Sequence, residues 1–321
     1  MHQKRVTVFG GSGFIGRYLV KRLAAEGNIV RVAVRDPEGA LFLKPFGSVG
    51  QIVPMPANLR NEASVRAAIS GVDSVVNLVG ILHGSGKQTF RAVHEEGPGL
   101  IGRIAREMQV ERVVHVSAIG ADPESPAEYG RTKAAGETAL RQGFPDATIV
   151  RPSIVIGAED EFFNRFAHMT RFSPFLPLIG GGRTRFQPVY VGDVAEAIER
   201  ILARPETAGR TFELGGPRIY TFRQLMELML KEIGKKRLLV PLPFWLASLQ
   251  AAFLEWLPNP PLTRDQVKLL RRDNVVAEGA ETFEALGIAP TNIKVILPTY
   301  LERFRSGGQF ARRETGGRTS T

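Results

Sequence analysis

Residues 8–20 read VFGGSGFIGRYLV, a stretch with four glycines in the seven residues between a β-branched run and an amphipathic one. Glycine weakens strands and helices, so a cluster here needs a local reason. The pattern is GxxGxxG from Gly10 and GxGxxG from Gly11. Such glycines turn the chain, leave bare backbone beside a pyrophosphate and let helix and strand approach. We therefore expect a dinucleotide to contact Gly10, Gly11, Ser12, Gly13, Phe14, Ile15, Gly16 and Arg17.

Short β-branched runs alternate with helical patterns over the first 150 residues. We predict strands at 6–9, 29–35, 51–54, 74–78, 112–117 and 147–151. We predict helices at 14–26, 62–70, 89–109 and 128–142. Strands that alternate with helices imply right-handed crossovers and a mainly parallel sheet covered on both faces. The predicted fold class is therefore a doubly wound α/β sheet.

The composition changes after Pro152, where Pro/Gly-rich connections such as SPFLPLIGGG become frequent. We predict a dinucleotide-binding domain over 1–152 and a smaller α/β lobe over 153–305. Residues 187–202 read as strand plus helix and are expected to return to the first sheet. The Gly-, Arg- and Thr-rich stretch 306–321 has no apolar periodicity, so a disordered tail is predicted there.

Composition narrows the classes of function. The 321 residues are 43% hydrophobic and carry a formal charge of +10, which favours an anionic ligand, lipid surface or protein face. The arginines are scattered and accompany no nucleic-acid-binding motif, so no nucleic acid is expected. The chain has no cysteine, and its five histidines show no HxH or HExxH spacing, so no metal site is expected. The first predicted strand begins near Met1, so we expect no signal or transit peptide.

Arg35 follows the second predicted strand, in VAVRDP, where the ribose of a bound dinucleotide would arrive. A carboxylate at this position accepts from the 2′-hydroxyl of NAD, whereas a guanidinium suits the 2′-phosphate of NADP. Arg17 could assist, and Asp36 is a carboxylate one residue further on. We expect NADP(H) to be preferred, with NAD(H) as the alternative.

A second group of polar residues comprises Ser117, Tyr129 and Lys133. Ser117 closes the strand RVVHVS, and YGRTK places Tyr129 and Lys133 one helical turn apart. A lysine cation beside a phenol lowers the pKa of the phenol and makes it a usable proton donor or acceptor. We predict these three residues to be catalytic, with Ser117 holding a carbonyl or hydroxyl while hydride moves.

These motifs resemble the extended or atypical short-chain dehydrogenases/reductases. The loop GGSGFIG, NLVG at 77–80, Ser117, YxxxK and the dipeptide RP at 151–152 occur in the order of that family. The resemblance implies a Rossmann fold and a role for Lys133 in holding the nicotinamide ribose. It also implies coenzyme contacts at Asn58, Leu59, Val79, Gly80, Tyr129, Lys133 and Pro152. Asn58 stands where the family often has an adenine-contacting Asp.

The second half resembles one branch of that family, the nucleotide-binding accessory subunits of respiratory complex I and their bacterial relatives. RPSIVIGAEDEFFNRFA, RFQPVYVGDVAEAI and LTRDQVKLLRRDNV carry this similarity, which spans roughly residues 4–305. It implies an NADPH held for structure or regulation, with complex I subunits as partners. We expect no mitochondrial presequence and therefore a bacterial member of this branch.

The segment 238–257 is the most apolar candidate for a membrane contact, but Pro241 and Pro243 interrupt it. The helix that can follow them, 244–257, is about 21 Å long and too short to span a bilayer. With Lys235, Lys236 and Arg237 just upstream, it could lie on an anionic membrane or a hydrophobic partner, or it could pack the core of its own lobe. We expect a cytoplasmic protein, free or peripheral on the cytoplasmic face of a bacterial inner membrane.

Two main functions therefore stay open. One is an accessory or assembly subunit of complex I that holds NADP(H). The other is an active NADP-dependent oxidoreductase or epimerase that uses Ser117, Tyr129 and Lys133 on a diffusible carbonyl or alcohol. A third hypothesis is a regulator that reports NADPH occupancy to a partner.

Overall fold

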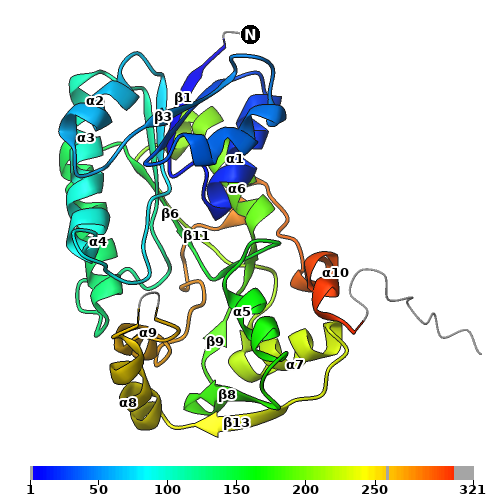
Figure 1. Ribbon diagram of the computed structural model, residues 1–321. Coiled ribbons are helices and arrows are strands. Elements are labelled where there is room, and N and C mark those ends of the chain that lie inside the picture. Colours follow the sequence, from blue (N-terminus) through cyan, green and yellow to red (C-terminus); the bar gives the residue numbers. More distant parts are fainter. Residues whose placement is uncertain (1–2, 258–259, 307–321) are drawn as a thin grey trace, which may run out of the picture.

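The computed structural model describes residues 3–257 and 260–306 (Figure 1). Seven strands of this part form one sheet in the order β11-β6-β5-β4-β1-β2-β3, and all neighbouring strands run parallel. The strands are β1 (Arg5–Phe9), β2 (Ile29–Val34), β3 (Ile52–Pro56), β4 (Ser74–Asn77), β5 (Arg112–Val116), β6 (Thr148–Pro152) and β11 (Thr211–Leu214). The doubly wound fold class predicted from the sequence is confirmed.

The chain reverses its direction of travel across the sheet between β1 and β4. From β1 it proceeds outward through β2 and β3, and it then returns to place β4 on the other side of β1. The loops after β1 and β4 therefore leave the carboxyl edge in opposite directions and open a crevice between them. The glycine-rich loop and residues 78–81 form the two sides of this crevice.

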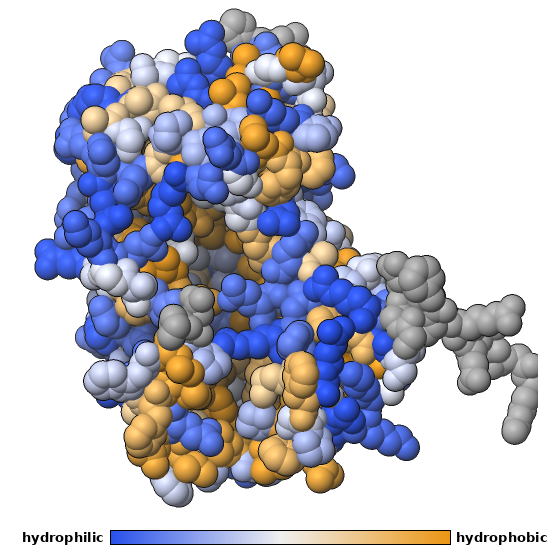
Figure 2. Space-filling view, viewed as in Figure 1, coloured by the Kyte–Doolittle hydropathy of each residue, from blue (hydrophilic) through white to orange (hydrophobic). Residues whose placement is uncertain are grey.

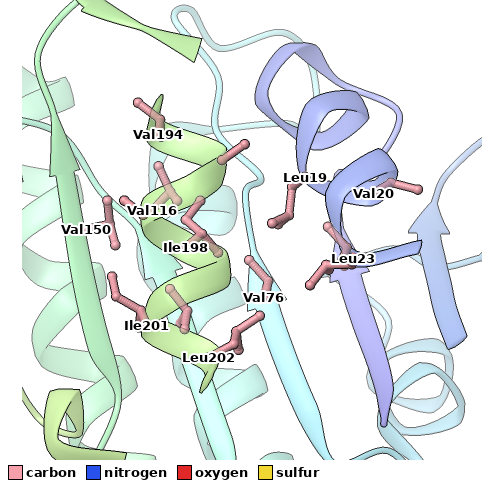
Figure 3. Close-up of a cluster of buried hydrophobic side chains, with 14 of the residues drawn as sticks. Leu19, Val20, Leu23, Val76, Val116, Val150, Val194, Ile198, Ile201 and Leu202 are labelled. Atoms are coloured by element: carbon pink, nitrogen blue, oxygen red, sulfur yellow. The ribbon is translucent and has the colours of Figure 1, made fainter. Parts of the chain in front are cut away.

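Two helices, α1 (Phe14–Ala25) and α6 (Val191–Ala203), cover one face of the sheet. Figure 3 shows Leu19 and Leu23 of α1 and Ile198 and Ile201 of α6 directed at Val76 and other strand side chains. All of these side chains are buried. Burial of each such side chain stabilises the folded state by about 1.5–3 kcal/mol. Because several residues of α6 are buried in this way, α6 belongs to the helix layer on this face of the sheet.

The opposite face carries α2 (Glu62–Ile69), α3 (Gly97–Glu107) and α4 (Glu128–Gly143), packed on a second cluster of buried apolar residues. α3 and α4 approach closely through glycine. A Cβ on Gly136 would lie 1.7 Å from the carbonyl oxygen of His94, and one on Gly102 would lie 2.6 Å from that of Leu140. Close contact explains why α4 tolerates a residue that lowers helix stability by about 1 kcal/mol.

The predicted helix 89–109 is divided in the structure. Residues Arg91–Glu96 form a π-helical turn, and α3 begins at Gly97. Pro98 lies in the first turn of α3 and has no N–H to donate to the preceding turn. The missing donor accounts for the change in helical pitch at this point.

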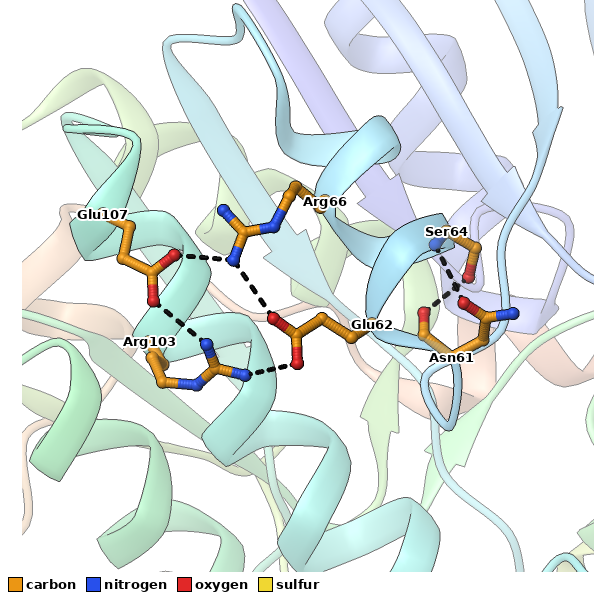
Figure 4. Close-up of polar contacts among 6 residues, drawn as sticks. All are labelled: Asn61, Glu62, Ser64, Arg66, Arg103 and Glu107. Atoms are coloured by element: carbon orange, nitrogen blue, oxygen red, sulfur yellow. Dashed lines mark hydrogen bonds and ion pairs between the residues drawn. The ribbon is translucent and has the colours of Figure 1, made fainter.

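A ring of four exposed charges joins α2 to α3 (Figure 4). Arg66 and Arg103 each bind both Glu62 and Glu107, with N–O distances of 2.7–3.1 Å. The two guanidinium groups hold the pKa of both carboxyls below the usual value. Asn61 caps α2 by accepting from the N–H of Ser64.

The remainder of the chain forms a smaller lobe below the sheet in Figure 1, with its own buried core. Its helices are α5 (Phe162–Met169), α7 (Phe222–Glu232), α8 (Phe244–Leu254), α9 (Arg264–Leu269) and α10 (Ile293–Leu301). Its strands pair in twos, namely β7 (Val155–Ile156) with β10 (Val189–Tyr190), β8 (Phe175–Ile179) with β13 (Leu238–Leu242), and β9 (Arg185–Phe186) with β12 (Tyr220–Thr221). None of the helices in the described ranges is long and apolar enough to cross a bilayer.

The division into domains 1–152 and 153–305 stays a prediction. β11, which was not predicted as a strand of the sheet, pairs with β6 and extends the large sheet from beyond residue 152. The predicted disordered tail falls almost wholly on residues 307–321, which lie outside the described residues.

Candidate functional site

The loop between β1 and α1 is built around its glycines. Gly10 has a φ of +76°, in the left-handed region that favours glycine. A Cβ on Gly16 would lie 2.5 Å from the carbonyl oxygens of both Gly10 and Gly11, so the helix can approach the loop only without that atom. Gly13 caps α1 without a side-chain hydrogen bond, and the first turn has no acidic residue. The first N–H groups of α1 are therefore suited to an anion.

The residues that follow the glycines of this loop make contacts within the protein. The ring of Phe14 faces Gly157, where a Cβ would lie 3.1 Å from it, and Ile15 packs on the core under α1. Arg17 forms an ion pair with Glu159 at 3.2 Å and lies over the ring of Phe42. The suggested help of Arg17 at a 2′-phosphate therefore has a competing carboxylate.

Arg35 and Asp36 follow β2 and have different surroundings. Arg35 is exposed and makes no hydrogen bond or ion pair within the part of the chain that the structure describes. The carboxylate of Asp36 accepts from the N–H of Gly39 at 3.1 Å, at the start of the 3₁₀-helix Glu38–Phe46. The carboxylate is thus committed to a turn, while the guanidinium is free for a ligand.

Asn58 and Leu59 follow β3. The side-chain oxygen of Asn58 accepts from the N–H of Arg60 at 3.1 Å. Leu59 is buried against Gly97, 3.0 Å from where a Cβ of that glycine would lie. Leu59 therefore supports α3 with its side chain.

The loop after β4 meets both the glycine-rich loop and α4. A Cβ on Gly10 would lie 3.3 Å from Val79, and one on Gly80 would lie 3.2 Å from the amine of Lys133. The N–H of Val79 donates to the side chain of Asn77 at 3.1 Å, which fixes the turn. The structure thus brings together the glycine-rich loop, residues 79–80 and Lys133.

Ser117 lies just beyond the end of β5, beside β6. Its N–H donates to the carbonyl of Val150 at 2.7 Å, and Pro152 accepts from the N–H of Ile119 at 3.0 Å. The hydroxyl of Ser117 is buried and has no hydrogen-bond partner among the described residues. This hydroxyl is enclosed by the protein rather than presented at the surface.

Tyr129 and Lys133 share one face of α4, as their spacing predicts. The amine of Lys133 lies 5.9 Å from the centre of the Tyr129 ring and donates to the carbonyl of Val116 at 3.3 Å. The Tyr129 ring meets the rings of His94 and Phe90 edge to face. The tyrosine is therefore held within an aromatic group.

The expected lowering of the tyrosine pKa is wrong for this structure. Burial raises the pKa of Tyr129 to about 12, because a phenolate loses its water there. Burial also lowers the pKa of Lys133 to about 8, opposed by the charge of Glu137 one turn along α4. The Lys133 amine lies over the face of the ring, and desolvation is the cause of the raised pKa.

His94 is a part of this site that sequence reasoning missed. Its Nε2 accepts from the N–H of Ile81 at 3.0 Å, and its Nδ1 lies 3.2 Å from the hydroxyl of Thr132. Burial, with a smaller effect of Lys133, lowers the pKa of His94 to about 2, so the ring is neutral at physiological pH. The histidine fastens the loop after β4 to α4. A lone histidine in HEEGPG offers no spacing signal for this role.

Asp265 of α9 was also missed. Its carboxylate accepts from the N–H of Glu128 at 2.7 Å and from that of Tyr129 at 3.0 Å. The smaller lobe therefore caps the helix that carries Tyr129 and Lys133. The two partners lie more than 130 positions apart in the sequence, so no local pattern could connect them.

Asn274 ties the segment after α9 to the same edge of the sheet. Its side chain accepts from Ser153 and donates to the carbonyl of Ile119, two residues from Ser117. Figure 2 shows the surface hollowed between the sheet layer and the lobe that carries α8 and α9, with apolar residues inside the hollow. No cluster of His, Asp or Glu suited to a metal ion occurs within residues 3–257 and 260–306.

Comparison with known proteins identifies the family. Residues 6–215 match the NAD dependent epimerase/dehydratase family. The chain belongs to this family. Within it, the chain is 38% identical over 314 residues to the alpha subcomplex subunit 9 of NADH dehydrogenase [ubiquinone] from Arabidopsis thaliana, covering 94% of this chain and 78% of that protein. It is 35% identical to the NADH-ubiquinone oxidoreductase 40 kDa subunit of Neurospora crassa, covering 95% and 80%.

Solved structures of the epimerase/dehydratase family share the fold. A dTDP-glucose 4,6-dehydratase from Streptomyces venezuelae has a TM-score of 0.72 at 21% identity, covering 94% of this chain and 96% of its own. The UDP-glucose 4-epimerase of Thermotoga maritima has a TM-score of 0.71 at 18% identity, covering 94% and 98%. The resemblance to short-chain dehydrogenases/reductases and to complex I accessory subunits, predicted from the sequence, is confirmed.

Proposed function

We propose that this protein is an accessory or assembly subunit of respiratory complex I that holds NADP(H) for structure or regulation. The observation that carries the proposal is the match to complex I subunits over 94–95% of the chain, including the lobe beyond residue 152. A coenzyme-binding half alone would be shared with many enzymes. A similarity that includes the second lobe points to the same partner.

The geometry of the crevice supports a pyridine dinucleotide. The uncapped N–H groups of α1 suit its pyrophosphate, with Gly10 to Gly16 allowing close approach. Val79 and Gly80 line the opposite side, and Lys133 and Tyr129 lie where the nicotinamide ribose would reach. When bound, the dinucleotide supplies the capacity for hydride transfer.

The preference for NADP(H) is supported by Arg35. Its guanidinium is exposed and unpaired among the described residues, and it can bind a 2′-phosphate with charge-assisted hydrogen bonds. Arg35→Asp should weaken NADP⁺ about tenfold or more relative to NAD⁺ in calorimetric titrations. Equal losses for both coenzymes would contradict the assigned role.

The state of the polar triad supports a held coenzyme rather than turnover. The Ser117 hydroxyl is buried, and the pKa of Tyr129 is raised to about 12. A substrate carbonyl would need access to the first group and a proton from the second. The raised pKa makes the phenol a weaker proton donor, and the burial of the hydroxyl limits access to it.

Contact with an anionic membrane surface is supported by α8. Trp245, Phe253 and Trp256 are 68%, 72% and 89% exposed, and the nearby Lys236 is also exposed. Aromatic rings and lysines in this combination suit the interface of an acidic bilayer. This arrangement would place the protein on the cytoplasmic face of a bacterial inner membrane, beside complex I.

Purification from native membranes tests the proposal. The tagged full-length protein should co-purify with complex I subunits, and mass spectrometry should detect NADPH released from it. A monomer that stays out of the membrane fraction and carries no coenzyme would overturn it.

An active NADP-dependent oxidoreductase or epimerase is the second candidate, favoured by the presence of Ser117, Tyr129 and Lys133 together. In that case Tyr129→Phe should abolish turnover of a carbonyl or alcohol substrate while NADP⁺ affinity stays within about threefold. Loss of coenzyme binding would instead assign Tyr129 to the binding site.

A further inference from the structure

The amino end of α4 has no capping side chain of its own. Ala127 stands at the N-cap position and cannot accept a hydrogen bond with its methyl group. Asp265 supplies the missing acceptor with both carboxylate oxygens, at 2.7 and 3.0 Å from the N–H groups of Glu128 and Tyr129. Its negative charge also suits the positive end of the helix.

α9, which carries Asp265, is anchored to α8. Val267 of α9 is buried with Ala247 and Ala251 of α8 in a small apolar cluster. Arg264, the residue before Asp265, forms an ion pair with Glu255 at 2.8 Å, just beyond the end of α8. A displacement of α8 therefore reaches Asp265 through direct contacts.

α8 meets the protein through a narrow face. Its buried residues are the two alanines, while Trp245, Leu249 and Phe253 are more than half exposed. An element with so few buried apolar contacts responds to changes at its surface more readily than the sheet core.

We propose that Asp265 is a positioning residue for the coenzyme site, through which coenzyme occupancy beside Tyr129 and the environment of α8 are coupled. The inference rests on the proposed coenzyme site. Coupling between two sites is reciprocal, so binding at the crevice must also alter α8. The path is short, from Tyr129 to Asp265 and from α9 to α8.

The chain offers its own reporter of this coupling. Its two tryptophans, Trp245 and Trp256, lie within and just after α8, and both are largely exposed. Full-length protein freed of co-purified coenzyme is titrated with NADP⁺ and followed by calorimetry and by tryptophan emission. The two curves should saturate together.

Asp265→Ala should weaken NADP⁺ about threefold to tenfold and remove the emission change. Asp265→Asn keeps one acceptor oxygen and should be intermediate in both measurements, which guards against a folding defect in the alanine variant. Asp273→Asn is the matched control, because that carboxylate of the same segment binds Arg185 and does not contact α4. It should behave as the wild type.

Three outcomes separate the inferences. If the wild-type protein, freed of co-purified coenzyme, gives no binding heat with NADP⁺, the proposed function fails. If NADP⁺ binds but tryptophan emission does not change, or if Asp265→Ala retains both wild-type affinity and the emission change, the positioning role is overturned while coenzyme binding stands.

Discussion

The sheet layer and the α8–α9 end of the smaller lobe use apolar residues in opposite ways. Valine, leucine and isoleucine of β1–β6, α1 and α6 are buried in a continuous cluster. The corresponding cluster under α8 and α9 has four buried residues, while large aromatic side chains of α8 face outward. The difference indicates that the sheet layer stabilises the fold and the α8 end is available for contact.

The largest expected effect is on the free energy of unfolding, and it tests the difference between the sheet layer and α8 directly. Ile198→Ala, in α6, should lower the free energy of unfolding by about 2–5 kcal/mol, because its side chain is fully buried. Phe253→Ala is the matched substitution in α8 and should change it by less than about 0.5 kcal/mol. Urea denaturation measures both. A similar cost at the two positions would show that α8 is part of the core.

Gly13→Val probes the ligand edge of the sheet layer. The added side chain would crowd the carbonyl of Gly10, which a Cβ would approach to 3.2 Å, and would project from the start of α1. We expect coenzyme affinity to fall about tenfold to hundredfold through lost hydrogen bonds to phosphate. Gly84→Val, whose Cβ would have 3.4 Å to its nearest neighbour, serves as the control in calorimetry. Unchanged affinity in Gly13→Val would contradict the assigned loop.

Lys133 is a buried charge, and its desolvation lowers the stability of the folded protein. Burial lowers the pKa of Lys133 to about 8 from a model-peptide value of 10.5, so the unfolded chain binds more protons between these pH values. The stability of the wild type should therefore rise with pH across that window relative to Lys133→Met. At pH 7 the methionine variant should be more stable, by about 1–3 kcal/mol. Unfolding curves with a constant difference from pH 7 to 10.5 would refute this.

The smallest effect concerns the exposed ring on α2 and α3. Glu107→Gln removes one carboxylate from four charges that face solvent, so we expect only a slight fall in the melting temperature at low salt. At 1 M NaCl the difference should vanish, because charges are screened within about 3 Å. A salt-independent loss would assign Glu107 a packing role.

The strands and helices of the first half could be predicted because buried parallel strands appear as β-branched runs separated by amphipathic segments. The boundaries agree to within two residues for the six predicted strands. The π-helical turn before α3 escaped prediction because the change in pitch depends on one missing N–H at Pro98.

The strands of the smaller lobe could not be predicted as well as those of the large sheet. β8 and β13 each contain a proline at an interior position, Pro177 and Pro241, which argues against a strand in sequence reasoning. In a two-stranded sheet each strand has a free edge, so a residue without an N–H is tolerated there. Pairing, rather than composition, decides the outcome.

In the candidate site, too, local spacing could be predicted from the sequence, whereas tertiary contacts could not. The positions of Gly10–Gly16, Lys133 and Tyr129 follow from local spacing, and the structure brings them to one crevice. The sign of the tyrosine pKa shift could not be predicted, because desolvation depends on Phe90 and His94 packed around the ring. The role of Asp265 could not be predicted because its hydrogen bonds to α4 join distant parts of the chain.

The contact of Gly136 with the backbone of His94 determines how closely α4 approaches the loop after β4. Any side chain at position 136 would push His94 away from α4 and with it the amide of Ile81 that the imidazole holds. The loop after β4 would then shift relative to Lys133. The absence of a Cβ at position 136 thus sets how closely the loop after β4 can approach α4.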